Sequence, residues 1–271
     1  MAHFALKYLR REVLPTSFCP GCGCGIVANC FLKAVEELGR SSLEGFVFCS
    51  GIGCSSWIPS PYFRADSIHA LHGRSIPVAM GVKLVRPDLQ VVVFGGDGDL
   101  AGIGLSHLIH AARRNLEVLV IMVNNMVYGM TGGQVAPTTP KGMVTGTTPY
   151  GNPEPSMDVA RLVADAGASY VARWTVAHAV ALKESIKRGL SVRGLAYVEA
   201  VAQCPSQLGR RNRMPSPAEL MRWLLKSSVS LAKLEGGWEE GKIPVGVYVD
   251  RERVGFVEAY RGMVEALRRG R

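Results

Sequence analysis

Four cysteines in this sequence have the residue type and spacing needed to bind a metal. Two residues separate Cys19 from Cys22 in a glycine-rich run, Cys54 follows a Gly-Ile-Gly run, and Cys204 precedes a proline. Thiolates at the spacing of the first two can turn toward one metal. The set predicts an iron–sulfur cluster or a zinc site, with scattered core thiols as the alternative. Cys-Pro pairs at Cys19 and Cys204 favour the cluster, because ferredoxin-type ligand runs end that way.

The number and surroundings of the cysteines argue against disulfides. The chain has seven cysteines, so pairing would leave one over, and the cytoplasm expected for this chain keeps thiols reduced. Cys30 and Cys49 lie in apolar surroundings and are interpreted as packing residues.

A second candidate site follows the apolar run 91–94, where Gly95-Gly96-Asp97-Gly98-Asp99 leads into a predicted helix near 103. A strand that ends in glycines before a helix offers main-chain N–H groups to a diphosphate. A Walker loop is excluded, because no Gly-Lys-Ser or Gly-Lys-Thr ends the run. Nicotinamide binding is disfavoured, because the next strand ends in Asn124-Asn125 rather than in the acidic residue that would bind the ribose.

Asp97 and Asn125 form a pair that can bind a cation. The 27 residues between them (98–124) suffice for a turn, a helix and a strand, so both can sit at the carboxyl ends of parallel strands about 4.8 Å apart. A carboxylate, an amide oxygen and the Val127 carbonyl are hard oxygen ligands, which suit Mg²⁺ that bridges two phosphates. A turn Asp with a capping Asn is the alternative.

The elements that must position these residues alternate along the chain. At 271 residues the chain is long enough for a full α/β core. Apolar runs predict buried parallel strands at 46–49, 91–94, 118–123 and 196–201. Helices are predicted at 26–38, 103–114, 157–166, 176–190, 218–234 and 254–267. This alternation predicts an α/β fold: a doubly wound, mostly parallel sheet with helices on both faces and ligands at the strands' carboxyl ends.

Two further expectations concern organisation. The segment 131–155 is rich in Gly, Thr and Pro, without an apolar period, and its length favours a functional loop. We expect residues 1–210 to form the cofactor-binding domain and residues 211–271 a basic extension that packs on it or on a partner subunit.

Several motifs taken together resemble a known family. Gly96-Asp97-Gly98, followed at the right interval by Asn124-Asn125, looks like the thiamine-diphosphate motif. The runs 19–23, 50–56, 71–74, 96–99, 127–134 and 137–140 together resemble the β subunit of 2-oxoacid:ferredoxin oxidoreductases, most closely the 2-oxoglutarate branch. The resemblance covers residues 19–205 and is specific as a set.

The resemblance implies a role for each matching residue. The cysteines that would hold a 4Fe-4S cluster are Cys19, Cys22, Cys54 and Cys204. The residues that would line the thiamine are Ile52, Gly53, Cys54, Ser55 and His72, and those that would hold the diphosphate are Gly98, Asp99, Gly129 and Met130. The Mg²⁺ ligands would be Asp97, Asn125 and the Val127 carbonyl.

Two residues depart from the pattern of the family, and a third is a candidate for substrate binding. Cys24 extends the ligand loop, which leaves the choice between Cys22 and Cys24 open. Trp57 stands where many relatives of the 2-oxoglutarate branch carry a basic residue, so we expect apolar 2-oxoacids such as pyruvate to be accepted alongside 2-oxoglutarate. Arg74, two residues after His72, is expected to pair with the substrate carboxylate, with a surface or interface salt bridge as the alternative.

The reaction that the resemblance implies is CoA-dependent oxidative decarboxylation of a 2-oxoacid, with electrons passing through the cluster to ferredoxin. No residue of this chain is assigned to activate the thiamine. The glutamate for that step is expected on a partner α subunit, so this subunit alone should be inactive. The rival hypotheses are a nonredox thiamine-diphosphate decarboxylase or synthase with a structural zinc site, and a noncatalytic metal-binding scaffold.

The net charge is +9, yet the sequence contains no nucleic-acid-binding motif that would explain this positive charge. Much of the excess falls at Arg210, Arg211 and Arg213 and in the last four residues. No signal peptide or membrane-spanning apolar run is recognisable, so neither nucleic acid nor membrane is expected as a partner and the protein is expected to be cytoplasmic.

Overall fold

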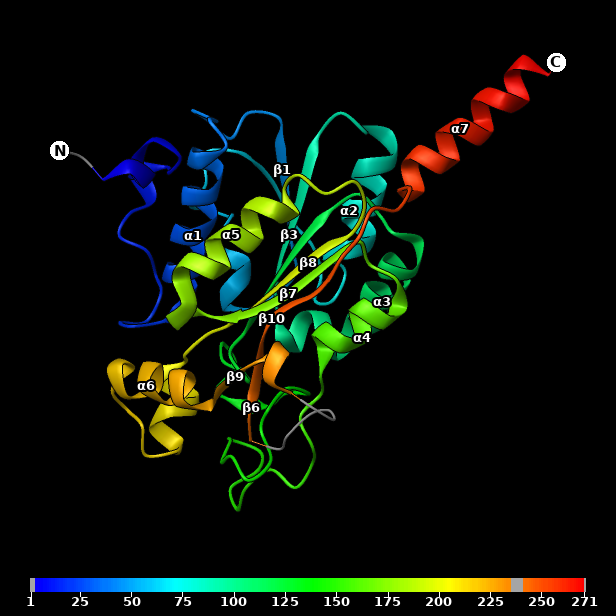
Figure 1. Ribbon diagram of the computed structural model, residues 1–271. Helices are drawn as coiled ribbons and strands as arrows, with labels where there is room; N and C mark the ends of the chain where they lie inside the picture. The colour runs from blue at the N-terminus through cyan, green and yellow to red at the C-terminus, as the bar shows by residue number, and fades with distance from the viewer. Residues whose placement is uncertain (1–2, 235–240, 271) are drawn as a thin grey trace.

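The computed structural model describes residues 3–234 and 241–270 and contains an eight-stranded sheet (Figure 1). Along the sheet the strand order is β2-β1-β3-β4-β8-β7-β10-β9. The strands are β1 (Phe46–Ser50), β2 (Asp66–His69), β3 (Gln90–Gly96), β4 (Leu119–Asn124), β7 (Tyr170–Thr175), β8 (Ala196–Val201), β9 (Ser228–Ser230) and β10 (Ile243–Asp250). Neighbouring strands are parallel except for β10, which runs antiparallel to β7. β5 (Val127–Tyr128) and β6 (Gln134–Val135) form a separate antiparallel pair.

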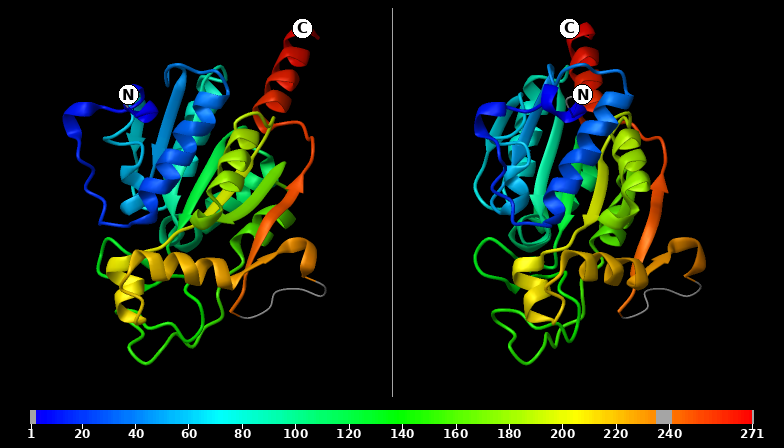
Figure 2. Two further views of the ribbon diagram at one scale, coloured as in Figure 1. Left: turned by 60° about the vertical axis from the view of Figure 1, so that its left-hand side comes forward. Right: turned by 90° about the vertical axis from the view of Figure 1, so that its left-hand side faces the viewer.

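Helices cover both faces of the sheet (Figure 2). They are α1 (Gly23–Glu37), α2 (Ser75–Val85), α3 (Leu105–Arg114), α4 (Val159–Ala166), α5 (Ala179–Gly189), α6 (Pro217–Ser227) and α7 (Phe256–Arg269). One core cluster packs α1 and α5 against the sheet, and the other packs α2, α3 and α4. The doubly wound, mostly parallel fold predicted from the sequence is confirmed.

The four apolar runs predicted as strands are confirmed as β1, β3, β4 and β8. Every residue of β4 and of β8 is buried, which explains why their sequences are almost continuously apolar. Two of the strands that were not predicted lack that signal: β2 is an exposed polar edge strand, and β7 carries Arg173 in its interior.

One predicted helix ends earlier in the structure, and one helix of the structure was not predicted. The helix expected at 218–234 ends at Ser227, where the Ser228 hydroxyl donates to the Leu224 carbonyl at 2.6 Å and the chain continues into β9. Helix α2 was not predicted, because its sequence from Ser75 to Val85 is apolar with little periodicity and contains Pro77 and Gly81.

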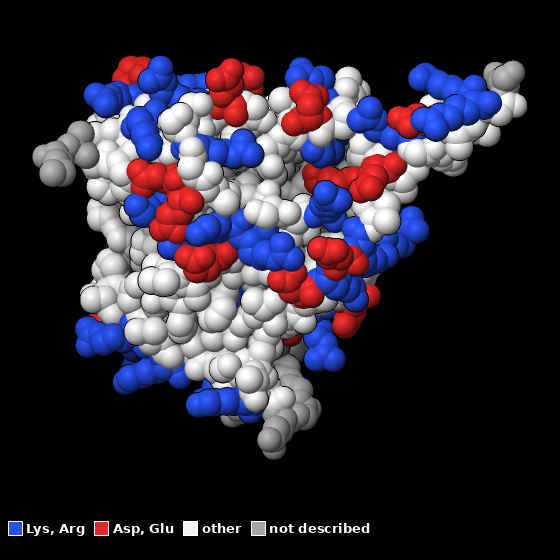
Figure 3. All heavy atoms as spheres, turned by 45° about the horizontal axis from the view of Figure 1, so that its top comes forward, with Lys and Arg blue, Asp and Glu red and all other residues white. Residues whose placement is uncertain are grey.

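The segment 211–271 contributes to the same sheet, because β10 pairs with β7. Helix α7 follows β10 and extends away from the body (Figure 1). On the face shown in Figure 3, which includes α7, Lys and Arg side chains are interspersed with Asp and Glu rather than gathered in one patch. Among the described residues, no helix has the length and apolar character needed to cross a membrane.

Candidate active site

The sheet places Asp97 and Asn125 beside each other. Asp97 directly follows β3, Asn125 directly follows β4, and these two strands are adjacent and parallel, with Gly96 opposite Val123. The main-chain N–H of Asn125 donates a hydrogen bond to the Asp97 carboxylate, and this bond lowers the pKa of Asp97. The predicted placement of the two residues at neighbouring carboxyl ends is therefore confirmed.

The Asp97 carboxylate has the surroundings of a cation ligand. Its side chain is 1% exposed, and one carboxylate oxygen accepts a 2.5 Å hydrogen bond from the Thr138 hydroxyl. Burial raises the pKa of Asp97 to about 7, although hydrogen bonds from Thr138 and from nearby main-chain N–H groups oppose the rise. A divalent cation would supply the positive charge that favours the carboxylate at this buried position.

A cavity of about 280 Å³ opens at this edge of the sheet. It is lined by all the residues expected to contact thiamine or the diphosphate: Ile52, Gly53, Cys54, Ser55, His72, Gly98, Asp99, Gly129 and Met130. The three expected Mg²⁺ ligands, Asp97, Asn125 and Val127, line the same cavity. Residues from four separate loops thus meet around one space. Trp57 and Arg74 are not among the lining residues.

The two residues expected to bind substrate lie near the cavity. Trp57 ends the short helix that begins at Cys54 and is 40% exposed. The Arg74 guanidinium donates to the carbonyls of Gly73, at 3.2 Å, and Ile103, at 3.4 Å. Their roles in substrate binding stay predictions.

Asp99 joins three of the loops that form the cavity. One of its carboxylate oxygens accepts from the Gly73 N–H at 2.7 Å and the Ile52 N–H at 3.2 Å, and it lies 2.8 Å from His72 Nδ1. Because the side chain is 1% exposed and negatively charged when ionised, any contact of Asp99 with a diphosphate would come from its main-chain N–H.

Two of the lining residues are glycines at positions where neighbouring atoms leave little or no room for a side chain. A Cβ on Gly98 would overlap the ring of Tyr128, which the sequence reasoning did not single out. A Cβ on Gly129 would lie 3.1 Å from Asn125 Nδ2, 3.7 Å from Cys204 Sγ and 3.8 Å from Cys54 Sγ. Gly129 therefore marks the point where the cavity, the Asp97–Asn125 pair and two of the cysteines meet.

The predicted cluster ligands influence one another electrostatically. Burial, followed by the sulfurs of Cys22, Cys204 and Cys19, raises the pKa of Cys54 to about 11. The pKa of Cys204 is also raised, first by burial, while the main-chain N–H groups of Gln207 and Leu208 oppose the rise. Neighbouring thiolates that repel one another are stabilised when a cationic metal centre binds them, so this donor set fits such a centre.

Cys24 is part of the same group. It is 2% exposed, it lines the cavity, and its hydrogen bond to the sulfur of Cys22 lowers the pKa of Cys22 to about 7. Within residues 3–234 and 241–270, no three His, Cys, Asp or Glu side chains lie close enough to hold a single ion. An iron–sulfur cluster places its own atoms between its cysteines, so its ligands are more widely spaced. Cys30 and Cys49 are 7% and 0% exposed, which confirms them as packing residues.

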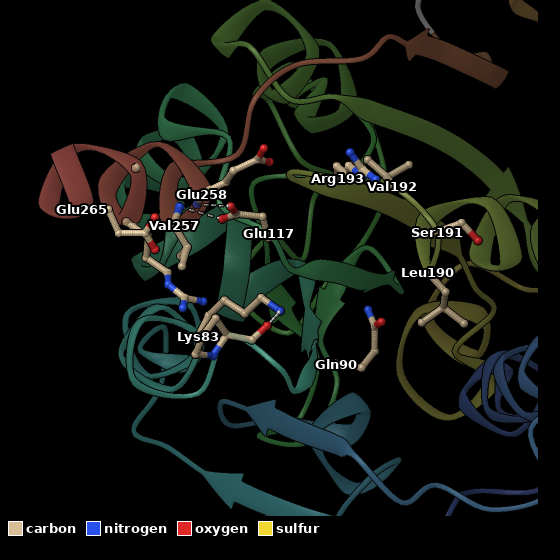
Figure 4. Close-up of a pocket in the computed structure, with 13 residues that line it drawn as sticks. Lys83, Gln90, Glu117, Leu190, Ser191, Val192, Arg193, Val257, Glu258 and Glu265 are labelled. Carbon is tan, nitrogen blue, oxygen red and sulfur yellow. Dashed lines mark hydrogen bonds between the residues drawn. The ribbon is translucent and has the colours of Figure 1, made fainter. Parts of the chain in front are cut away.

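A different cavity, of about 580 Å³, lies at the opposite edge of the sheet (Figure 4). There the Glu117 carboxylate accepts from the main-chain N–H groups of Val257, at 3.0 Å, and Glu258, at 2.9 Å. Lys83 donates to the carbonyls of Pro87 and Leu89. These charged groups attach α7 and close the end of α2, and they lie away from the Asp97 site.

Comparison with known proteins gives consistent results. Residues 51–200 match the family described as thiamine pyrophosphate enzyme, C-terminal TPP binding domain. The 2-oxoglutarate synthase subunit KorB of Methanocaldococcus jannaschii is 51% identical over 269 residues, which cover 98% of this chain and 99% of that protein. The 2-oxoacid:ferredoxin oxidoreductase 2 subunit beta of Aeropyrum pernix is 43% identical over 189 residues, covering 70% of this chain and 60% of that protein.

A solved structure also resembles this fold. It is the 2-oxoglutarate:ferredoxin oxidoreductase from Magnetococcus marinus, with 2-oxoglutarate, coenzyme A and succinyl-CoA bound. The TM-score is 0.84 at 32% sequence identity, and the match covers 96% of this chain and 89% of that chain.

Proposed function

This chain belongs to the β-subunit family of 2-oxoacid:ferredoxin oxidoreductases, and on that premise we propose that it holds thiamine diphosphate and Mg²⁺ at the carboxyl edge of its sheet. The observation that carries the proposal is that twelve residues expected at such a site line one cavity, although they come from four separate loops. When bound, thiamine diphosphate supplies the carbanion chemistry needed to decarboxylate a 2-oxoacid.

The three oxygen donors proposed to bind Mg²⁺ differ in charge. Asp97 would be the charged ligand, and Asn125 and the Val127 carbonyl would be the neutral ones. The main-chain N–H groups of Gly98 and Asp99 would hold the diphosphate from one side, and Gly129 and Met130 would hold it from the other. Support comes from the glycines: Gly98 and Gly129 line the cavity, and their missing side chains let the main chain pack closely beside Tyr128 and the cysteine sulfurs.

His72 faces the cavity with one ring nitrogen already engaged. Its Nδ1 lies 2.8 Å from the Asp99 carboxylate, which fixes the ring orientation and favours the proton on Nδ1. The other ring nitrogen, Nε2, is then an acceptor for a hydrogen bond from the substrate or the cofactor. No residue of this chain is assigned to activate the thiamine, and we expect a glutamate of the partner α subunit to do so.

Cys19, Cys22, Cys54 and Cys204 are proposed to hold a 4Fe-4S cluster. When bound, such a cluster transfers single electrons, which a reaction releasing an electron pair to ferredoxin requires. Cys54 lines the cavity and its sulfur lies beside Gly129. A cluster held by Cys54 would therefore lie close to a cofactor bound in the cavity, and the electrons would travel a short distance.

For the substrate we propose 2-oxoglutarate, with pyruvate also accepted. The names of the KorB relatives and of the solved structure point to 2-oxoglutarate. Trp57, which offers an apolar face and no cation, supports tolerance of pyruvate. The partners would be an α subunit, ferredoxin, coenzyme A and the 2-oxoacid.

The test is an anaerobic assay of this chain co-expressed with its α subunit. We expect ferredoxin reduction that depends on coenzyme A, with 2-oxoglutarate as the better substrate and pyruvate as a weaker one. The chain alone should show none. A colourless complex that carries stoichiometric zinc and decarboxylates without reducing ferredoxin would instead support a nonredox thiamine enzyme.

A further inference from the structure

A buried ion pair lies in the middle of the sheet, behind the proposed Mg²⁺ site. Arg173 of β7 and Glu199 of β8 are opposite each other, and their side chains are 2% and 1% exposed. Arg173 Nε is 3.0 Å from a Glu199 carboxylate oxygen. Burial would lower the pKa of Arg173, but Glu199, Tyr248 and Asp158 raise it above its usual value. Apolar residues of similar volume often give equal stability at such positions, so stability alone does not explain the pair.

Asn124 connects this pair to the proposed Mg²⁺ ligands. Its side-chain Nδ2 donates to the other Glu199 oxygen at 2.8 Å, and its Oδ1 accepts from the Met126 N–H at 3.1 Å. Asn124 is 6% exposed, so neither hydrogen bond competes strongly with water. The orientation of the Asn124 amide is therefore set by Glu199.

The residue that Asn124 holds has an unusual backbone conformation. Met126 has φ of 64°, in the left-handed region that side chains other than glycine rarely adopt. The Thr139 hydroxyl donates to the Met126 carbonyl at 2.6 Å, so both main-chain groups of this residue are bound. Met126 lies between Asn125 and Val127, and its conformation determines how these two residues are presented.

The other side of the ion pair leads to Asp97. Arg173 donates to Asp158 Oδ1 at 2.5 Å. Two residues earlier, the Ser156 hydroxyl donates to the Thr138 carbonyl at 2.9 Å, and the Thr138 hydroxyl donates to Asp97 at 2.5 Å. Residues on both sides of the ion pair thus connect it to all three proposed ligands.

We propose that the Arg173–Glu199 pair is a positioning element for the Mg²⁺ site, acting through Asn124 on the turn at Met126. The proposal rests on the proposed function, because it assumes that Asp97, Asn125 and Val127 bind Mg²⁺. Glu199 and Arg173 do not touch the cation. They hold the turn so that Asn125 and Val127 are already positioned beside Asp97 before the cation binds.

The experiment measures cation binding directly in the assembled complex after removal of thiamine diphosphate and metal by a chelator. Mn²⁺ replaces Mg²⁺ as the probe, and its binding in the presence of thiamine diphosphate is followed by electron paramagnetic resonance. Asn124→Ala removes the link, and Glu199→Gln keeps the shape but removes the charge. We expect the Kd for Mn²⁺ to rise roughly tenfold in Asn124→Ala, the equivalent of one charge-assisted hydrogen bond, and less in Glu199→Gln.

The matched control is Tyr248→Phe. The Tyr248 hydroxyl accepts from Arg173 at 2.7 Å on the side away from Asn124, so this variant weakens the same buried group without touching the link. We expect it to lower the thermal stability and leave the Kd for Mn²⁺ unchanged. Activity of Asn124→Ala should return to within about twofold of the parent at saturating Mg²⁺ and thiamine diphosphate, because positioning affects binding of the cation rather than its chemistry once bound.

A fourth variant, Asp97→Ala, separates the two ideas. If Mn²⁺ binds to Asp97→Ala as it does to the parent, the proposed metal site is wrong. If Asp97→Ala abolishes binding while folded Asn124→Ala and Glu199→Gln both bind as the parent does, only the positioning role is overturned. A Kd that rises equally in Tyr248→Phe would also overturn it, because the effect would then be general destabilisation. If Asn124→Ala fails to fold, Glu199→Gln decides alone.

Discussion

Replacing Asp99 tests how the cavity is assembled. Its carboxylate accepts two main-chain hydrogen bonds, from Gly73 at 2.7 Å and Ile52 at 3.2 Å, and pairs with His72 at 2.8 Å. Asp99→Ala leaves the two N–H groups without an acceptor. A buried unsatisfied donor costs about 1–3 kcal/mol, so the free energy of unfolding should fall by roughly 2–6 kcal/mol. Relaxation of the loops places the expected value near the lower end.

Two assays follow from this estimate. For a chain of this length, 1 kcal/mol corresponds to roughly 2–4 °C, so the melting temperature of Asp99→Ala should fall by about 5–10 °C. Because the loops carrying Ile52 and His72 lose their common anchor, the Kd for thiamine diphosphate in isothermal titration of the assembled complex should rise at least about tenfold.

The control for Asp99→Ala is Asp88→Ala. Asp88 pairs with Arg86 at 2.6 Å, but both side chains are more than half exposed, and exposed pairs contribute little. Asp88→Ala should therefore leave both measurements unchanged. If Asp99→Ala melts within a degree or so of the parent and binds the cofactor equally well, Asp99 does not hold the loops and the reasoning is refuted.

Four further outcomes are expected. Asp97→Ala should abolish thiamine diphosphate binding in a titration, because Mg²⁺ would be left with neutral ligands against two phosphates; unchanged affinity would contradict the metal assignment. Cys204→Ser should lose the cluster and ferredoxin reduction while keeping part of the decarboxylation half-reaction, and undiminished ferredoxin reduction would remove Cys204 from the ligand set. Trp57→Arg should shift the ratio of kcat/KM toward 2-oxoglutarate over pyruvate by roughly ten- to a hundredfold, the equivalent of about 1.5–3 kcal/mol, whereas an unchanged ratio would return selectivity to the partner chain. In cluster-free protein at pH 7, Cys22, whose pKa its hydrogen bond with Cys24 lowers to about 7, should be alkylated well before Cys49, whose pKa burial raises to about 12; equal rates by mass spectrometry would contradict this.

The part of the site that could be predicted depends on strand ends. Asp97 and Asn125 each follow an apolar run, and runs of that kind form parallel strands whose carboxyl ends meet, so their proximity follows from the sequence alone. The glycines around Gly98 and Gly129 also indicated a site, because glycine allows the main chain to approach a ligand or another segment closely.

The contacts that stabilise the site could not be predicted, because they join distant parts of the chain. Asp99 reads locally as a turn residue, yet its partners Gly73 and Ile52 are 26 and 47 positions away. Arg173 made β7 harder to recognise, since a charge in a strand usually indicates exposure, whereas the apolar run of β8 was recognised despite Glu199. Their burial is explained by their position opposite each other on adjacent strands, where the two charges form an ion pair.

The most direct test of the account is the optical spectrum of the anaerobic complex during a single turnover. On addition of 2-oxoglutarate and coenzyme A, without ferredoxin, the visible absorption of an oxidised 4Fe-4S cluster should bleach, and it should not bleach when thiamine diphosphate has been removed. A complex that contains thiamine diphosphate and consumes 2-oxoglutarate without any change in visible absorption would contradict the proposal that Cys19, Cys22, Cys54 and Cys204 carry electrons away from the thiamine.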